Sequence, residues 1–271
     1  MSGGRPTPEV DVVPEGVLPA LDFPARPDRA RTDRDILGLT WPVVVAQSIV
    51  TAVSLVDILM LGMLGTATLA AVGYATQFLF LVQACLMAIG SAGVAMMARA
   101  LGADDHQRAR ESLATTMTLA LIASGVLSVI ALAIPRQLLH LLDVLDPIVE
   151  LAVPYFRLTL AAAVPLGIAV AFEHAHQAAR DTRRPMLIAI ALSAVKLLLN
   201  WILIFGALGA PRLGLVGAGL ATLGAQIVAA LLYLITSRRH PEPSVRLVPG
   251  DLRVSRARMG EAVRIALPAI G

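Results

Sequence analysis

Long apolar runs separated by short polar segments occupy most of the chain from residue 36 onward. A bilayer core of about 30 Å needs about 20 apolar residues in a helix, and six runs reach that length. They are Ile36–Leu64, Leu69–Ala98, Leu113–Ile134, Ile148–Ala171, Pro185–Phe205 and Leu215–Thr236. The proline-bounded stretch Pro135–Pro147 is too short to span, and it predicts a turn of helix at the membrane interface. The pattern therefore predicts an all-α polytopic membrane protein whose six transmembrane helices, within residues 34–238, form one bundle.

The two ends of the chain are polar. Residues 1–33 mix prolines, acids and arginines without the apolar run of a signal peptide, so they predict a disordered cytoplasmic tail. Residues 239–258 are polar and basic, as expected of a cytoplasmic linker between two lobes. The segment "AVRIALPAI" near the end resembles "ILGLTWPVV" in the first span. Such a repeat is typical of duplicated transporters, and it predicts that residues 259–271 begin a second, truncated lobe.

Composition and charge agree with a membrane protein and set its orientation. Of 271 residues, 57% are hydrophobic and only 15% are charged, whereas soluble domains carry about 25% charged residues. The net charge of +3 does not indicate a nucleic-acid partner, because the arginines lie in short loops between apolar runs. Twelve arginines fall on the side of the N-terminus and two, Arg136 and Arg212, on the other. This bias predicts a cytoplasmic N-terminus. The expected location of this multi-pass, lipid-surrounded protein is the plasma membrane of a prokaryote.

Three polar side chains inside the spans share one depth. Lys196 is the only lysine of the chain, and Asn200 follows it one helical turn later. From the helical rise, Asp57 lies about 12 Å from the end of its helix, Lys196 about 15 Å and Asn200 about 9 Å. Lys196 and Asn200 share a helix face, so both can meet Asp57. This predicts an ion pair between Asp57 and Lys196, with either a functional role or a purely structural one.

Further polar residues predict a cavity beside this pair. Gln47, Gln77 and Thr222 are the candidates for its walls, although each could equally serve helix packing. Glu173, His174 and His176 suggest a metal cluster, but two histidines two residues apart diverge on a helix. We therefore expect a hydrated mouth there and no metal. The sequence has no nucleophile–base pair, cofactor loop or zinc-ligand spacing, so neither an enzyme nor a cofactor is expected.

Several segments, in order and at fixed intervals, carry a family resemblance. They are "WPVVVAQSIVTAVSLVDILMLGMLG" from Trp41, "MMARALGADD" from Met96, "QAARDTRRPM" from Gln177 and "LNWILIFGALGAPRLGLVGAGLAT" from Leu199. With them the chain resembles the N-terminal half of a multidrug and toxic compound extrusion transporter. That family belongs to a superfamily that also contains polysaccharide and lipid flippases.

The resemblance implies a fold, a function and a site. The fold would be the N-lobe of a twelve-helix, inverted-V transporter that works by alternating access, with the second six-helix lobe C-terminal to Gly271. The function would be multidrug efflux, in which cationic or amphipathic drugs leave in exchange for protons or sodium ions. Asp57 matches the coupling aspartate, and Asn200 matches one of its two polar partners. Lys196 stands where asparagine is common, and its charge would repel a sodium ion, so protons are the expected coupling ion.

Two alternatives remain open from the sequence. A lipid-linked oligosaccharide flippase would need several basic residues in its cavity, and the candidates are Lys196 and Arg157. A non-transporting scaffold would need no charge pair inside the membrane, so Asp57 and Lys196 count against it. The truncated second lobe, in contrast, favours a non-transporting fragment. Drug efflux is the primary interpretation.

Overall fold

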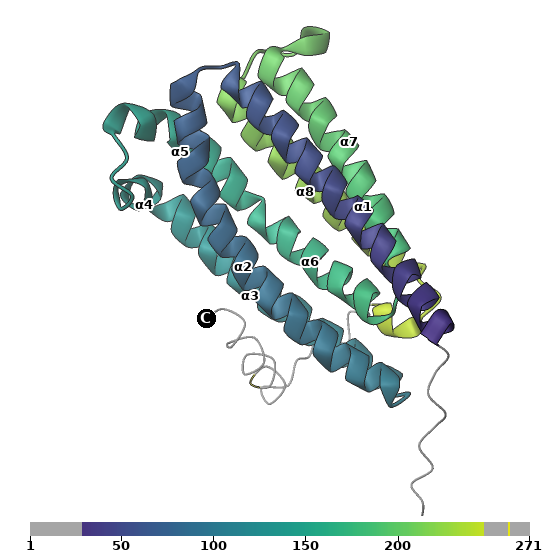
Figure 1. The fold of residues 1–271 in the computed structure, drawn as a ribbon. Coiled ribbons are helices and arrows are strands. Elements are labelled where there is room, and N and C mark those ends of the chain that lie inside the picture. The colour runs from purple at the N-terminus through teal and green to yellow at the C-terminus, as the bar shows by residue number, and fades with distance from the viewer. Residues whose placement is uncertain (1–28, 247–259, 261–271) are drawn as a thin grey trace, which may run out of the picture. The chain divides into compact units, whose positions relative to one another are not determined.

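A computed structural model of the chain describes residues 29–246 and residue 260, and its regular structure is helical. The elements are α1 (Arg29–Gly62), α2 (Thr66–Gly102), α3 (His106–Ala133), α4 (Pro135–His140), α5 (Asp146–Ala161), α6 (Ala163–Ala178), α7 (Arg183–Phe205), η1 (Ala207–Gly209), α8 (Gly214–Arg238) and η2 (Pro243–Val245) (Figure 1). Within the described residues, six stretches are long and apolar enough to cross a membrane: Leu37–Gly62, Thr66–Gly102, His106–Ile130, Asp146–Ala178, Arg183–Phe205 and Gly214–Arg238. The predicted all-α fold with six spans is confirmed.

The chain divides into two compact units, Met1–Leu37 and Gly38–Gly271, and the boundary falls within α1. Because α1 begins at Arg29, residues 29–33 of the predicted tail are helical. The rest of that tail lies outside the described residues. The same holds for residues 247–258 of the predicted linker and, apart from residue 260, for the predicted start of a second lobe.

Within the second unit, α2 packs against α3 and α6, and α8 packs against α5, α6 and α7 (Figure 1). The two larger apolar clusters of the described residues lie around Phe156 and Leu86 and around Phe172 and Met97, and a small third one contains Ala88 and Ala92. Large apolar side chains are also exposed, with Trp201 an example. In a helix long enough to span a bilayer, such side chains are expected to contact lipid.

The fourth predicted span is interrupted. Helix α5 ends at Ala161 and α6 begins at Ala163, with Ala162 between them. Pro165 has no backbone N–H, so it cannot donate to the carbonyl group of Ala161 four residues earlier. The hydropathy of this stretch shows no interruption, which is why the sequence predicted one helix. The short α4, in contrast, confirms the turn of helix predicted between Pro135 and Pro147.

The backbones of α7 and α8 approach each other closely at Gly217. A Cβ atom added to Gly217 would lie 2.5 Å from the carbonyl oxygen of Leu203, a backbone atom that cannot turn away. We therefore expect Gly217→Ala to lower the free energy of unfolding by about 2 kcal/mol, the usual cost of overpacking. Thermal unfolding in detergent measures this effect. Gly125→Ala is the matched control, since nothing lies within 4 Å of its added Cβ. Equal melting temperatures for the two variants would contradict the prediction.

Candidate functional site

Asp57 joins α1 to α7 through both of its carboxylate oxygens. Oδ2 forms an ion pair with Nζ of Lys196, and Oδ1 accepts a hydrogen bond of 2.5 Å from Nδ2 of Asn200. Lys196 and Asn200 lie one turn apart on α7, so their side chains reach the same point on α1. The predicted convergence of the three residues is confirmed in the structure.

The three side chains are largely removed from solvent. The side chains of Lys196 and Asp57 are 26% and 14% exposed, and Asn200 is buried. Oδ1 of Asn200 is buried without a hydrogen-bond partner in the described part of the chain. The arrangement therefore keeps two opposite charges together in an apolar bundle, where either charge alone would be costly. Chemically, the site holds a carboxylate against an ammonium group and an amide group of the neighbouring helix.

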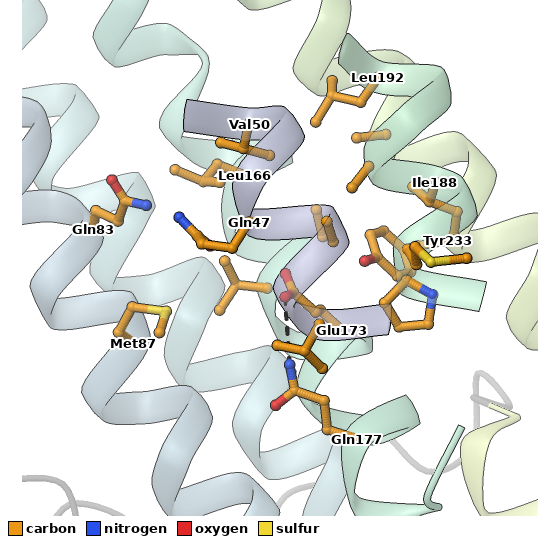
Figure 2. A pocket seen from close by; sticks show the side chains of 18 of the residues that line it. Gln47, Val50, Gln83, Met87, Leu166, Glu173, Gln177, Ile188, Leu192 and Tyr233 are labelled. Atoms are coloured by element: carbon orange, nitrogen blue, oxygen red, sulfur yellow. Dashed lines mark hydrogen bonds between the residues drawn. The ribbon is translucent and has the colours of Figure 1, made fainter. Parts of the chain in front are cut away.

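A separate cavity of about 690 Å³ lies between α1, α2, α6, α7 and α8 (Figure 2). Its walls are mostly apolar and include Val50, Met87 and Leu192, and Tyr233 also lines it. Glu173 is the one charged side chain among the described residues that line it, and Nε2 of Gln177 donates to its Oε1 over 3.4 Å. The arrangement can accommodate an apolar molecule that carries a positive charge.

The structure places some predicted cavity residues in these walls and others elsewhere. Gln47 from α1 lines the cavity and points toward Gln83 of α2 (Figure 2). Gln77 is exposed and is not among the lining residues. The hydroxyl group of Thr222 donates to the carbonyl of Ala218 in its own helix, and Thr222 does not line the cavity either.

The ion pair and the cavity are two sites rather than one. Asp57 is not among the cavity-lining residues, and ten residues of α1 separate it from Gln47. At the rise of an α-helix this is about 15 Å along the axis. The sequence predicted the cavity directly beside the ion pair, because hydropathy does not reveal which way a side chain points. Glu173, for which the sequence predicts a hydrated mouth, lies in the cavity wall.

His174 and His176 point to different neighbours, as their spacing predicts. His174 lies against Gly90 of α2, where an added Cβ would come within 2.5 Å of its ring. The His176 ring lies perpendicular to that of His240, with ring centroids 5.1 Å apart. The two histidines therefore do not form one site with each other.

Asp181 connects the loop after α6 to the segment after α8. Its Oδ2 accepts a hydrogen bond of 3.0 Å from Nε2 of His240, and its Oδ1 accepts one of 3.3 Å from the backbone N–H of Arg184. Burial by itself would raise the pKa of Asp181. These hydrogen bonds and the charge of Arg184 outweigh that effect, so the pKa lies below its ordinary value. The contribution of Asp181 to stability is therefore present above the pKa of an unfolded aspartate and is lost as the pH falls through its folded pKa.

Comparisons with known proteins agree with this arrangement. A family model described as MatE matches residues 42–202. A probable multidrug resistance protein NorM of Rhizobium meliloti (strain 1021) is 31% identical over 239 residues, which are 87% of this chain and 50% of that protein. A probable multidrug resistance protein NorM of Thermotoga maritima is 26% identical over 219 residues, covering 80% of this chain and 47% of that protein.

Solved structures show the same fold. A crystal structure of MATE in the bent conformation superposes with a TM-score of 0.78 at 25% identity, covering 88% of this chain and 52% of that one. The chain spans about half the length of the curated relatives it matches. The match to the family model extends over more than half of the chain, and the chain therefore belongs to the MatE family of multidrug and toxic compound extrusion (MATE) transporters.

Proposed function

We propose that the protein carrying this chain is a multidrug efflux transporter that exports cationic or amphipathic small molecules by antiport with protons. The observation that carries the proposal is the composition of the cavity. Its walls are mostly apolar, and Glu173 is the single charged residue among those described there. An apolar site with one acidic group favours an organic cation, which can bury its apolar surface and place its charge against the carboxylate.

The same composition argues against a lipid-linked oligosaccharide as substrate. A pyrophosphate group needs basic side chains, and the described lining residues include no arginine or lysine. Lys196 is already paired with Asp57, and Arg157 is exposed on α5. The cavity therefore favours a cation over an anion.

The ion pair supports protons as the coupling ion. Both oxygens of Asp57 already contact α7, one of them through the ammonium group of Lys196. A sodium ion at Asp57 would have to displace this charge or bind beside it, and both are unfavourable. A proton binds directly to a carboxylate oxygen and needs no coordination space beside Asp57.

Two further parts of the proposal concern the whole protein. We place the N-terminus in the cytoplasm, because the arginines of the loops gather on that side. The similar NorM proteins of bacteria support a prokaryotic cell. We also propose a second six-helix lobe that completes the transport pathway. Its support is that the chain covers 50% of a relative and 52% of a solved structure.

Everted membrane vesicles from bacteria that express the full protein test the proposal. A fluorescent organic cation should accumulate when a proton gradient is imposed, and an uncoupler should release it, because proton return drives the uptake. A sodium gradient alone should not support accumulation. Vesicles without the protein are the control. Accumulation driven only by sodium would contradict the proton assignment, and flipping of a lipid-linked oligosaccharide without dye uptake would contradict drug efflux.

A further inference from the structure

Three potential metal ligands meet at the end of the bundle where α6 ends and α7 begins. They are His176 near the end of α6, Asp181 in the following loop and His240 just after α8. One ligand atom of each lies within 4.8 Å of the others. The turn that brings Asp181 under His176 depends on Arg180, which adopts a left-handed conformation with φ of 57°, and on a hydrogen bond of 2.9 Å from Asp181 N–H to the His176 carbonyl.

His176 has a free ring nitrogen at this point. Its Nδ1 lies 2.8 Å from the carbonyl oxygen of Phe172, so Nδ1 carries the proton and donates it. Its Nε2 is then a lone-pair acceptor, and it is buried without a hydrogen-bond partner among the described residues. The whole residue is 0% exposed. An unpaired buried acceptor is costly, and a histidine anchored through Nδ1 to a carbonyl is typical of a metal ligand.

We propose that His176, Asp181 and His240 form a binding site for a divalent first-row transition metal such as Zn²⁺. Imidazole nitrogens and a carboxylate oxygen are its usual ligands, at about 2.0–2.2 Å in tetrahedral geometry. Three protein ligands leave the fourth position for water. The site is distinct from the cavity and from the Asp57 ion pair, and it holds the loop after α6 against the segment after α8.

Three present contacts must change when the metal binds: the hydrogen bond from His240 to Asp181, the one from Glu242 to His240, and the contact between Arg184 and Asp181. Nδ1 of His240 accepts a hydrogen bond of 3.1 Å from the backbone N–H of Glu242, so the ring proton lies on Nε2 and is donated to Asp181. Ligation through Nε2 moves this proton to Nδ1, and the bond from Glu242 is lost. Nη1 of Arg184 lies 3.2 Å from Oδ2 of Asp181, so its guanidinium group must turn toward solvent. Arg184 is therefore a competitor of the metal for the carboxylate.

The test uses the full protein that carries this chain, purified in detergent, freed of its affinity tag and stripped with chelator. Co²⁺ is the probe, because its visible absorption reports tetrahedral ligation, and Zn²⁺ should displace it. His176→Gln should lower the affinity for Co²⁺ at least about tenfold, whereas His140→Gln at α4 should leave it unchanged. Arg184→Gln should raise the affinity about tenfold, because it removes a competing positive charge.

The outcomes separate a metal site from a purely structural cluster. A histidine variant that misfolds would also lose affinity for Co²⁺, and that loss would not identify a ligand. Misfolding cannot, however, make Arg184→Gln bind Co²⁺ more tightly. Equal Co²⁺ binding by the wild-type and His176→Gln proteins would overturn the proposal. So would an Arg184→Gln protein that binds no more tightly than the wild type.

Discussion

Lys196→Met, made alone, is expected to lower the free energy of unfolding by about 3 kcal/mol, because it leaves the Asp57 carboxylate without its counter-charge in a largely buried position. Asp57→Asn should cost a similar amount, since it leaves the ammonium group unpaired. The double variant, which carries both changes, should recover most of the loss, because two neutral groups then face each other. Thermal unfolding in detergent of the four proteins completes this cycle.

Asp146→Asn is the matched control for the charge change. The side chain of Asp146 is 89% exposed and its described ion-pair partner is His140, so its replacement should leave the melting temperature unchanged. Additive losses in the Asp57 and Lys196 variants would show that the pair contributes no coupling energy. That result would contradict the interpretation of the pair as a link between α1 and α7.

The same pair carries a prediction for transport. Our hypothesis is that it opens when Asp57 takes up a proton or when substrate binds. In proton-loaded vesicles, Lys196→Asn in the full protein should therefore change the transport rate and its pH profile. An unchanged rate together with an unchanged profile would show that the pair is only structural, whatever its effect on stability.

Glu173→Gln is expected to weaken the binding of a fluorescent organic cation at least about tenfold, or about 1.4 kcal/mol, because it removes the charge from the cavity wall. The prediction rests on the proposed drug efflux function. Glutamine keeps the size of the side chain and can still contact Gln177, so the shape of the cavity should be preserved. Fluorescence polarisation of the dye with purified protein measures the affinity.

A neutral dye of similar size tests whether the substitution changes the affinity through the charge of Glu173 or through the shape of the cavity. Its affinity should be the same for the Glu173→Gln and wild-type proteins. Glu150→Gln is the control variant, since the side chain of Glu150 is 63% exposed and pairs with Arg136 outside the cavity. Unchanged affinity for the cation in Glu173→Gln would remove Glu173 from the binding site.

The sequence was sufficient to predict the spans and the polar contact between α1 and α7. Apolar runs of membrane length predict helices that cross the bilayer. The helical rise gives the depth of Lys196 and Asn200, and their spacing of four places both on one face of the helix. The break at Ala162 was missed because hydropathy averages over Pro165. The separation of the cavity from Asp57 was missed because it depends on how each helix is rotated about its axis.

The cluster at His176 was missed for a different reason. Its three members come from a helix end, a loop and a segment beyond another helix, so no spacing in the sequence announces them. The left-handed conformation of Arg180 decides where Asp181 points, and arginine is not a residue from which such a conformation is predicted. The useful signal in the sequence was a histidine near the end of α6, His176, followed closely by the acidic loop residue Asp181.

The pairing of the only lysine of the chain with Asp57 makes the ion pair accessible to chemical labelling. An amine-directed reagent can modify this chain at two kinds of group, the N-terminal amine and the side chain of Lys196. An ammonium group held by a carboxylate must lose its proton and leave its partner before it reacts. We therefore expect the labelling rate of Lys196 to report how often its ion pair with Asp57 opens.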